Sequence, residues 1–391
     1  MTASPAGPRL LFYAREATGL GQLARLHTVC RGLSRHWPGV AQLVVTGSPF
    51  PERLSGLPGV DWIKLPSVER VGPDVFAPRS LPMPIEKLRR LRGAVLLAAV
   101  REFRPHVLVV DSFPDDPEVL PALQLNGADG HRCRRVLALR DVVAEPELVR
   151  QTWMAAGVSK LLDDVYDLIL VYGDDTLYPA ARDYDFSPAA LAKTRYVGYL
   201  RREAEASVEE VRTAIGLTTG RLVLVTAGGG RDGYPLLRAA LDAAALPGRP
   251  ADWLLVTGPF MPDSERRTLI AAARARSGVR VVARVDDLPA HVAAADAVVS
   301  MGGYNTLCEI LSFERPAVIV PRVRPIREQL VRSELLRQRG LIDMIHPDEL
   351  TPGRVRAAVD HLPPRPSGIP PRLDDVRNVA DALRDLLASP S

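Results

Sequence analysis

Residues 296–329 contain the glycines and polar residues whose types and spacing best fit a chemical role. An apolar run, Ala297–Val299, is predicted to be a strand, and Gly302 and Gly303 follow it closely. Because glycine lacks a Cβ atom, a ligand can approach the backbone of this turn closely. The segment therefore favours a binding site at the end of a strand.

A helix is predicted to begin directly after the two glycines, with Asn305 and Thr306 as its capping residues. Free N–H groups and the positive end of the helix dipole would then face an anion, most naturally a diphosphate. Glu309 lies one turn further along this helix, where its carboxylate could accept hydrogen bonds from both hydroxyls of a ribose. These residue types together favour a nucleoside diphosphate as the ligand.

A second strand, Ala317–Pro321, is predicted to return to the same edge of the sheet. It is followed by four polar side chains that would lie beside the pocket: Arg322, Arg327, Glu328 and Gln329. A nucleotide diphosphate with a polar group attached fits this layout. The alternative is an ordinary strand–helix unit whose glutamate and glutamine are simply solvated.

This order of residues resembles the donor-sugar site of GT-B glycosyltransferases, especially the family 28 type, the undecaprenyl-diphospho-muramoylpentapeptide N-acetylglucosaminyltransferases and their bacterial relatives. The resemblance implies that Gly302 and Gly303 receive the diphosphate and that Glu309 holds the ribose. It also implies that Glu328 and Gln329 read the hydroxyls of the sugar. The expected co-substrate is a nucleotide-sugar, most naturally UDP-linked, with no further cofactor.

A second glycine cluster, residues 226–233, follows the predicted strand Leu222–Thr226. It matches neither a Walker A loop nor the GxGxxG pattern. The resemblance places Gly229, Gly230 and Arg231 near the donor, and it places the main chain of Val285 against the nucleobase. The alternatives are a tight strand-to-helix turn and a plain loop.

The chain has few lysines, and none of them lies in its second half: Lys64, Lys87, Lys160 and Lys193. A pyridoxal-phosphate Schiff base in the second half and a phosphate-binding loop with a lysine are both excluded. Paired aspartates occur without a clear DxD motif, and helix caps explain them well. We therefore expect no metal, and leaving-group charge would be met by helix dipoles and arginines.

Predicted strands and helices alternate along the chain, which indicates parallel sheets in an α/β fold. The expected strands are Leu10–Ala14, Gln42–Thr46, Trp62–Leu65, Val107–Asp111, Val136–Leu139 and Leu168–Tyr172, then Leu222–Thr226, Trp253–Thr257, Val279–Ala283, Ala297–Ser300 and Ala317–Val320. With the resemblance, they predict the GT-B fold, in which two doubly wound Rossmann-like domains face each other across a cleft, with ligands at the carboxyl ends of the strands.

The chain is expected to divide into an acceptor-binding domain, residues 1–197, and a donor-binding domain, residues 217–370. Residues 198–216, charged and short of core residues, would be the linker. Residues 371–391 contain a helical pattern, and the resemblance implies that this tail crosses back onto the first domain.

The acceptor-side loop is predicted at Gly19, Gly21 and Gln22, after the first strand. The resembled family often has a histidine after this loop, whereas this chain has Gln22. An amide has no basic lone pair near neutral pH, so Gln22 cannot act as a general base.

Three carboxylates are alternative candidates for the base that deprotonates the acceptor: Glu16, Asp111 and Asp141. Each follows or ends a predicted strand of the first domain, where the carboxyl ends of the strands should line the cleft. Each could equally be a helix cap or a hydrogen-bonded loop residue.

Composition places the chain among soluble globular proteins. It has 391 residues, 47% hydrophobic and 25% charged, with a net charge of +4. No basic track with interleaved aromatics indicates nucleic-acid binding. Three isolated cysteines (Cys30, Cys133 and Cys308), no leader pattern and no long apolar run predict a cytoplasmic protein without a transmembrane segment. The amphipathic segment 84–103 leaves peripheral membrane contact open.

The predicted function is transfer of a hexose from a UDP-sugar, such as UDP-N-acetylglucosamine, to an unknown small-molecule or lipid-linked acceptor. Inversion at the anomeric carbon follows from the resemblance, and independence from metal follows from the lack of a clear DxD motif. Two alternatives remain open on the sequence: a non-hydrolysing nucleotide-sugar 2-epimerase, and a non-catalytic nucleotide-sugar-binding protein.

Overall fold

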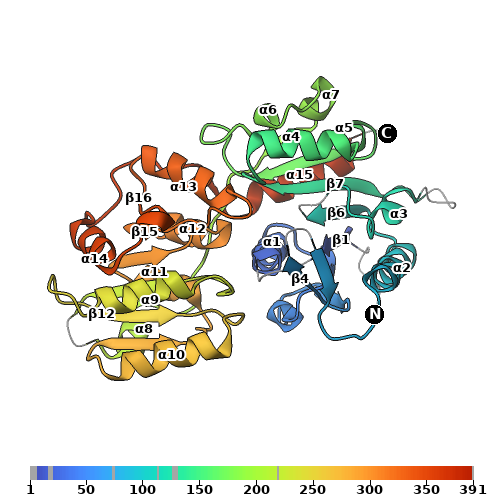
Figure 1. Cartoon of the computed structure of the whole chain (residues 1–391). Coiled ribbons are helices and arrows are strands. Elements are labelled where there is room, and N and C mark those ends of the chain that lie inside the picture. Colours follow the sequence, from blue (N-terminus) through green and yellow to red (C-terminus); the bar gives the residue numbers. More distant parts are fainter. Residues whose placement is uncertain are drawn as a thin grey trace. The chain divides into compact units, whose positions relative to one another are not determined.

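The computed structural model describes residues 7–15, 21–72, 75–111, 114–125, 131–217 and 220–389. The chain forms two units (Figure 1): unit 1 is Met1–Leu200 with Arg372–Ser391, and unit 2 is Arg201–Pro371. Residues 201–216, expected as part of a linker, belong to unit 2, where α8 (Val208–Ile215) is closed by a capping box between Ser207 and Glu210. The C-terminal tail belongs to unit 1.

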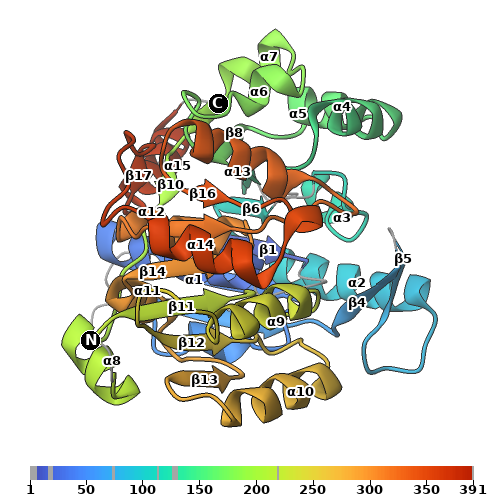
Figure 2. The same ribbon diagram turned by 60° about the vertical axis from the view of Figure 1, so that its left-hand side comes forward.

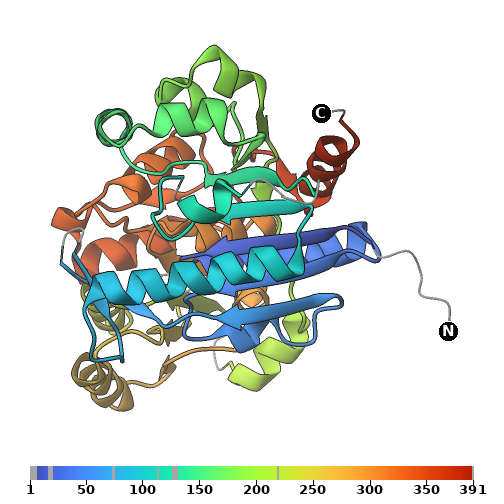
Figure 3. The ribbon, with the colours of Figure 1, turned by 90° about the vertical axis from the view of Figure 1, so that its right-hand side faces the viewer.

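The described part of unit 1 contains a seven-stranded parallel sheet in the order β3-β2-β1-β6-β7-β8-β9. The central strands are apolar over most of their length because helices cover both faces of a parallel sheet. Figure 3 shows α2 lying along one face. The strands are β1 (Arg9–Ala14), β2 (Ala41–Thr46), β3 (Val60–Lys64), β6 (Val107–Asp111), β7 (Arg134–Arg140), β8 (Leu168–Tyr172) and β9 (Thr194–Tyr196).

The helices of unit 1 connect these strands, and the chain returns to the unit at its C-terminus. The returning strand β17 (Leu373–Asp374) pairs in parallel with β10 (Tyr199–Leu200), and a Cβ atom on Gly32 of α1 would collide with Val376. A hairpin of β4 (Val68–Gly72) and β5 (Val75–Pro78) precedes α2. The helices are α1 (Gly21–His36), α2 (Ile85–Phe103), α3 (Leu120–Leu123), α4 (Pro146–Ala155), α5 (Val158–Asp164), α6 (Ala180–Asp183), α7 (Pro188–Ala192) and α15 (Arg377–Ala388), with a 3-10 turn at Pro51–Leu54.

The described part of unit 2 contains a six-stranded parallel sheet in the order β13-β12-β11-β14-β15-β16. Its strands are β11 (Leu222–Thr226), β12 (Asp252–Val256), β13 (Val279–Val282), β14 (Ala297–Ser300), β15 (Ala317–Ile319) and β16 (Asp343–Met344). Two parallel sheets flanked by helices confirm the predicted α/β fold with two Rossmann-like domains.

Helices α9 (Tyr234–Ala243) and α14 (Pro352–His361) pack against each other over one face of this sheet, as Figure 2 shows. They enclose an apolar core that includes Val225, Leu237 and Trp253. The remaining helices of unit 2 are α10 (Asp263–Arg274), α11 (Leu288–Ala294), α12 (Tyr304–Ser312) and α13 (Glu328–Gln338), with a 3-10 turn at Pro347–Glu349.

Candidate functional site

The carboxyl ends of β11 and β14 lie side by side in unit 2, where Thr226 is paired with Ser300. The strand order reverses between these two strands, because the chain continues to β12 on one side and to β15 on the other. Ligands of doubly wound sheets bind at such a reversal point. Both glycine segments singled out in the sequence, 226–233 and 302–303, begin there, so the structure brings them together.

The N-terminus of α12 is open. Its N-cap residue is Gly303, and no side chain caps it, so the expectation that Asn305 and Thr306 cap this helix is wrong. Both residues lie within the first turn, and Asn305 Oδ1 instead accepts a hydrogen bond of 2.6 Å from Arg202 Nη2. A Cβ atom on Gly303 would meet nothing within 4 Å. The N-cap residue of α12 therefore has open space beside its Cα atom, which would allow an anion to approach this end of the helix.

Gly302 has a different role from its neighbour. A Cβ atom there would lie 2.6 Å from Ser333 Oγ and 3.1 Å from the carbonyl oxygen of Gln329, both on α13. The fully buried Arg332 of α13 donates a hydrogen bond of 3.2 Å to the carbonyl oxygen of Gly302. Gly302 therefore packs the turn directly onto the helix that begins with Glu328 and Gln329.

This difference predicts opposite outcomes for two alanine substitutions. Gly302→Ala should destabilise the protein by about 1–3 kcal/mol, because the added methyl overpacks the contact with α13. Gly303→Ala should change the free energy of unfolding by less than about 0.5 kcal/mol, since its φ of −66° and ψ of 140° suit any residue. Its methyl would instead occupy the ligand's approach. Urea unfolding and UDP titration of both variants measure the two effects, and UDP binding that survives in Gly303→Ala would contradict this assignment.

Glu309 lies in the second turn of the same helix and is 8% exposed. Thr306, one turn earlier, is also buried. A carboxylate in this position faces little bulk water, which strengthens any hydrogen bond that it accepts from a ligand hydroxyl.

Glu328 and Gln329 begin α13 and are both buried, at 7% and 6% exposure. Gln329 Oε1 accepts the backbone N–H of Arg322 at 2.9 Å. The carboxylate of Glu328 lies between two guanidinium groups, 3.4 Å from Arg322 Nη2 and 3.8 Å from Arg332 Nη2. Arg332 was not singled out in the sequence, because a single arginine on a helix normally indicates a solvated surface.

The glycine loop after β11 is held close to the neighbouring loop after β12. Gly228 and Gly230 have positive φ angles of 61° and 89°, and a Cβ atom on Gly230 would collide with the carbonyl oxygen of Thr257. Arg231 in this loop is exposed to solvent. The Oδ2 atom of its neighbour Asp232 lies 3.5 Å from Arg322 Nη1. This ion pair links the first glycine loop to the segment after β15.

Two further candidates lie at the edges of this region. Val285 is half-buried in the loop after β13, and Asp287 in that loop caps α11 through a 2.9 Å bond to the N–H of Ala290. Arg327 is exposed and is the N-cap residue of α13. Their assignment to the donor remains a prediction.

The candidate bases of unit 1 are engaged or lie outside the described residues. Glu16 lies outside the described residues, as does Gly19 of the predicted acceptor-side loop. Asp111 is 1% exposed and accepts hydrogen bonds from Arg25 Nη2 at 2.5 Å and Nε at 3.2 Å. Both carboxylate oxygens therefore already face a guanidinium, which favours a structural role for Asp111.

Asp141 and Gln22, at the start of α1, also form hydrogen bonds within unit 1. Asp141 is 1% exposed and accepts a hydrogen bond of 2.5 Å from the hydroxyl of Tyr199. Gly21 begins α1, and Gln22 Nε2 donates to the carbonyl oxygen of Asp111 at 2.9 Å. Gln22 thus ties the start of α1 to the carboxyl end of β6, at the reversal point of the unit 1 sheet.

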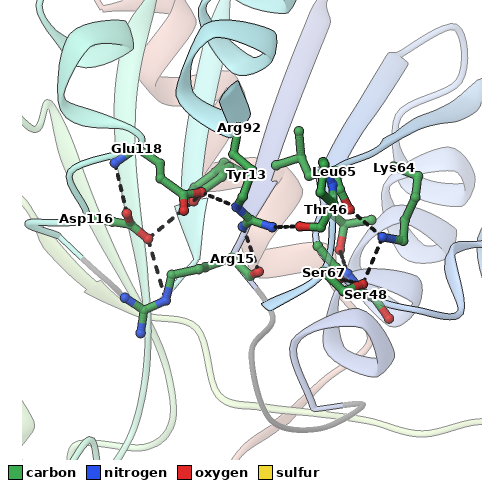
Figure 4. A network of polar contacts seen from close by, with 12 residues as sticks. Tyr13, Arg15, Thr46, Ser48, Lys64, Leu65, Ser67, Arg92, Asp116 and Glu118 are labelled. Atoms are coloured by element: carbon green, nitrogen blue, oxygen red, sulfur yellow. Dashed lines mark hydrogen bonds and ion pairs between the residues drawn. The ribbon is translucent and has the colours of Figure 1, made fainter. Parts of the chain in front are cut away.

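Sequence reasoning missed a buried polar cluster at this end of unit 1, which we call the Tyr13 cluster: Tyr13, Arg15, Arg92, Asp116 and Glu118 (Figure 4). The hydroxyl of Tyr13 lies 2.8 Å from Glu118 Oε2 and 3.2 Å from Asp116 Oδ2. Arg92 Nε donates to Glu118 Oε2 at 2.7 Å, and its Nη2 donates to the carbonyl oxygen of Arg15 at 3.1 Å. The partners of these bonds are 26 to 105 residues apart, so no local pattern could reveal them.

Among the residues that the structure describes, no group of three or more metal-ligating side chains could hold a metal ion. None of the helices within those same ranges has the length and apolar character needed to cross a membrane.

The two Rossmann-like units define the chain as a protein of the GT-B fold, and comparison with solved structures supports this. The calicheamicin glycosyltransferase CalG4 superposes with a TM-score of 0.59 at 18% identity, over 97% of this chain and 94% of that one. Acinetobacter baumannii MurG superposes with a TM-score of 0.57 at 14% identity, over 97% of this chain and 99% of that one. At these identities the likeness concerns the fold.

Sequence comparison narrows the class of unit 2, because residues 224–369 match the glycosyltransferase family 28 C-terminal domain. The UDP-N-acetylglucosamine–N-acetylmuramyl-(pentapeptide) pyrophosphoryl-undecaprenol N-acetylglucosamine transferase of Rhodopseudomonas palustris is 28% identical over 49% of this chain. An uncharacterised glycosyltransferase of Methanopyrus kandleri is 29% identical over 56% of this chain. The matches span 51% and 59% of those relatives. The predicted resemblance to family 28 GT-B glycosyltransferases is thereby confirmed.

Proposed function

We propose that this chain transfers a hexose from a UDP-linked sugar, such as UDP-N-acetylglucosamine, to an acceptor hydroxyl, with inversion and without a metal ion. The observation that carries the proposal is the open N-terminus of α12 beside Gly303, with the buried Glu309 on the same helix. The family match of residues 224–369 and the activity named for the Rhodopseudomonas palustris relative support it.

The donor would bind with its diphosphate at the N-terminus of α12, where no side chain forms a cap. The N–H groups of its first turn and the helix dipole stabilise the negative charge that grows on the diphosphate as the glycosidic bond breaks. Glu309 would accept hydrogen bonds from the ribose hydroxyls. The amide NH2 of Gln329 would donate to a sugar hydroxyl, because Gln329 Oε1 is held by the backbone of Arg322.

The acceptor would bind in unit 1 at the carboxyl ends of β1 and β6, where the order of the strands reverses. We expect a small or lipid-linked acceptor in the cytoplasm, and peripheral membrane contact fits the lipid-linked case. A 2-epimerase and a non-catalytic binding protein are not favoured, because the family match is to glycosyltransferases.

Thermal unfolding with UDP, dTDP, GDP, ADP and UDP-N-acetylglucosamine tests the donor assignment. A ligand at about 100 times its dissociation constant stabilises the folded protein by roughly 2.7 kcal/mol, an easily measured shift. We expect the uridine ligands to stabilise the protein and the adenine and guanine ligands to do so much less. If no nucleotide raises the unfolding temperature, the proposed function is wrong.

A further inference from the structure

The Tyr13 cluster lies at the carboxyl ends of β1 and β6, where the proposed function places the acceptor. Tyr13 is the penultimate residue of β1, and Asp116 and Glu118 follow β6 on the other side of the reversal point. The guanidinium of Arg92 joins these segments, because it contacts Glu118, the carbonyl oxygen of Arg15 and, at 2.6 Å, that of Pro66. Figure 4 shows the five side chains of the cluster converging there.

Two glycines, Gly47 and Gly93, leave room for Arg92 and Glu118 to pack closely in this cluster. A Cβ atom on Gly47, at the carboxyl end of β2, would lie 2.7 Å from Arg92 Nη1 and would collide with the carbonyl oxygen of Arg15. A Cβ atom on Gly93 would lie 3.3 Å from the carbonyl oxygen of Glu118. Two glycines thus allow close packing around a buried charge pair, which fixes the position of the Glu118 carboxylate.

A general base needs a carboxylate oxygen that can still accept a proton from the acceptor. Asp111 offers both oxygens to Arg25. Asp116 accepts the N–H of Glu118 on Oδ1 at 3.0 Å, and its Oδ2 faces Tyr13 at 3.2 Å and Arg15 Nε at 3.6 Å. The Glu118 side chain differs, because both hydrogen bonds that it accepts from described residues end on Oε2. Within the described part of the chain, no donor forms a hydrogen bond to its Oε1.

The surroundings of Glu118 also make it a stronger base than an exposed glutamate. Burial raises its pKa, and the nearby carboxylate of Asp116 raises it further, while Arg92 and the hydroxyl of Tyr13 lower it; the net pKa is raised. Burial likewise raises the pKa of Tyr13 well above its ordinary value, so Tyr13 remains a hydrogen-bond donor. Arg15 acts on the cluster through Asp116. A carboxylate with a raised pKa is suited to proton abstraction near neutral pH.

We propose that Glu118 is the general base of the acceptor site, with Tyr13 and Arg92 as the residues that position it; this rests on the proposed glycosyltransferase function. The proton of the acceptor hydroxyl moves to Glu118 Oε1 as the acceptor oxygen bonds to the anomeric carbon. The bond from that carbon to the diphosphate oxygen breaks, and UDP leaves with the electron pair. Glu118 then returns its proton to water. It would replace the histidine that the chain lacks at Gln22.

Glu118→Gln tests the proposal, with Glu102→Gln on the exposed end of α2 as the matched control. UDP release from UDP-N-acetylglucosamine is measured with water and with a panel of alcohols and phenols as acceptors. We expect Glu118→Gln to lower turnover at least a hundredfold, while Glu102→Gln retains it and both variants keep the UDP-induced thermal stabilisation. Wild-type turnover in Glu118→Gln would overturn the proposal but leave the donor assignment intact. If UDP does not raise the unfolding temperature of the wild type, the proposed function itself is wrong.

Tyr13→Phe separates a base from a merely structural carboxylate. The phenol hydrogen bond lowers the pKa of Glu118, so its removal should raise that pKa further. Turnover rises with pH as Glu118 loses its proton, and the acidic limb of the kcat/KM profile should therefore move to higher pH. Infrared difference titration of wild type against Glu118→Gln reads the same ionisation without turnover. A midpoint near the ordinary value of about 4.3, or one unmoved by Tyr13→Phe, would overturn the proposal.

Discussion

Glu309→Gln is expected to weaken binding of UDP-linked donors by roughly tenfold to a hundredfold. Hydrogen bonds to a charged group contribute about 1.5–3 kcal/mol each, and every 1.4 kcal/mol is about tenfold in affinity. The carboxylate of Glu309 can accept from two ribose hydroxyls at once, whereas the amide of glutamine offers a single neutral acceptor. Because Glu309 is 8% exposed, its bonds are made with little competition from water.

Isothermal titration calorimetry with UDP measures this loss directly. Glu334→Gln is the matched control, since Glu334 is exposed on α13 and the same change there should leave the affinity unaltered. A nucleotide without ribose hydroxyls, 2′,3′-dideoxy-UDP, should bind wild type and Glu309→Gln equally. Equal affinity of both proteins for UDP itself would show that Glu309 does not hold the ribose.

Local patterns were sufficient to predict the central strands of both sheets. The runs 222–225 and 107–110 are continuous and apolar because parallel strands are covered on both faces. Glycines after two such runs predicted the turns at the reversal point of unit 2. The short strands β9 and β16 and the β4–β5 hairpin were missed, since two to five residues carry little periodic signal.

The side-chain roles were harder to predict, because they depend on partners that are distant in the sequence. Asn305 fits a helix cap by its type and position, but Arg202, 103 residues away, holds its side-chain oxygen within the first turn. Asp111 was a candidate base because it ends an apolar strand. Only the fold shows that Arg25, 86 residues earlier, covers its carboxylate. Buried arginines such as Arg92 and Arg332 are rare, so sequence alone assigns them to the surface.

Breaking the buried ion pair between Arg25 and Asp111 is expected to cause a large loss of folding stability. Arg25→Met should destabilise unit 1 by about 3–5 kcal/mol, because it leaves the carboxylate of Asp111 buried without its cation. The two side chains are 2% and 1% exposed, so water cannot replace the lost partner. Arg25 also lies over the ring of Tyr172, 5.9 Å from its centroid, and the smaller methionine would loosen this contact too. Urea unfolding of Arg25→Met against the wild type measures this loss of stability.

The double variant Arg25→Met with Asp111→Leu distinguishes a structural role of Asp111 from a role as the general base. Replacing a buried ion pair by apolar side chains of similar volume is often neutral or stabilising, so most of the lost free energy of unfolding should return. If Asp111 is structural, the refolded double variant should also recover turnover, whereas a base cannot be replaced by leucine. Recovered stability without recovered turnover would make Asp111 the base and would remove that role from Glu118.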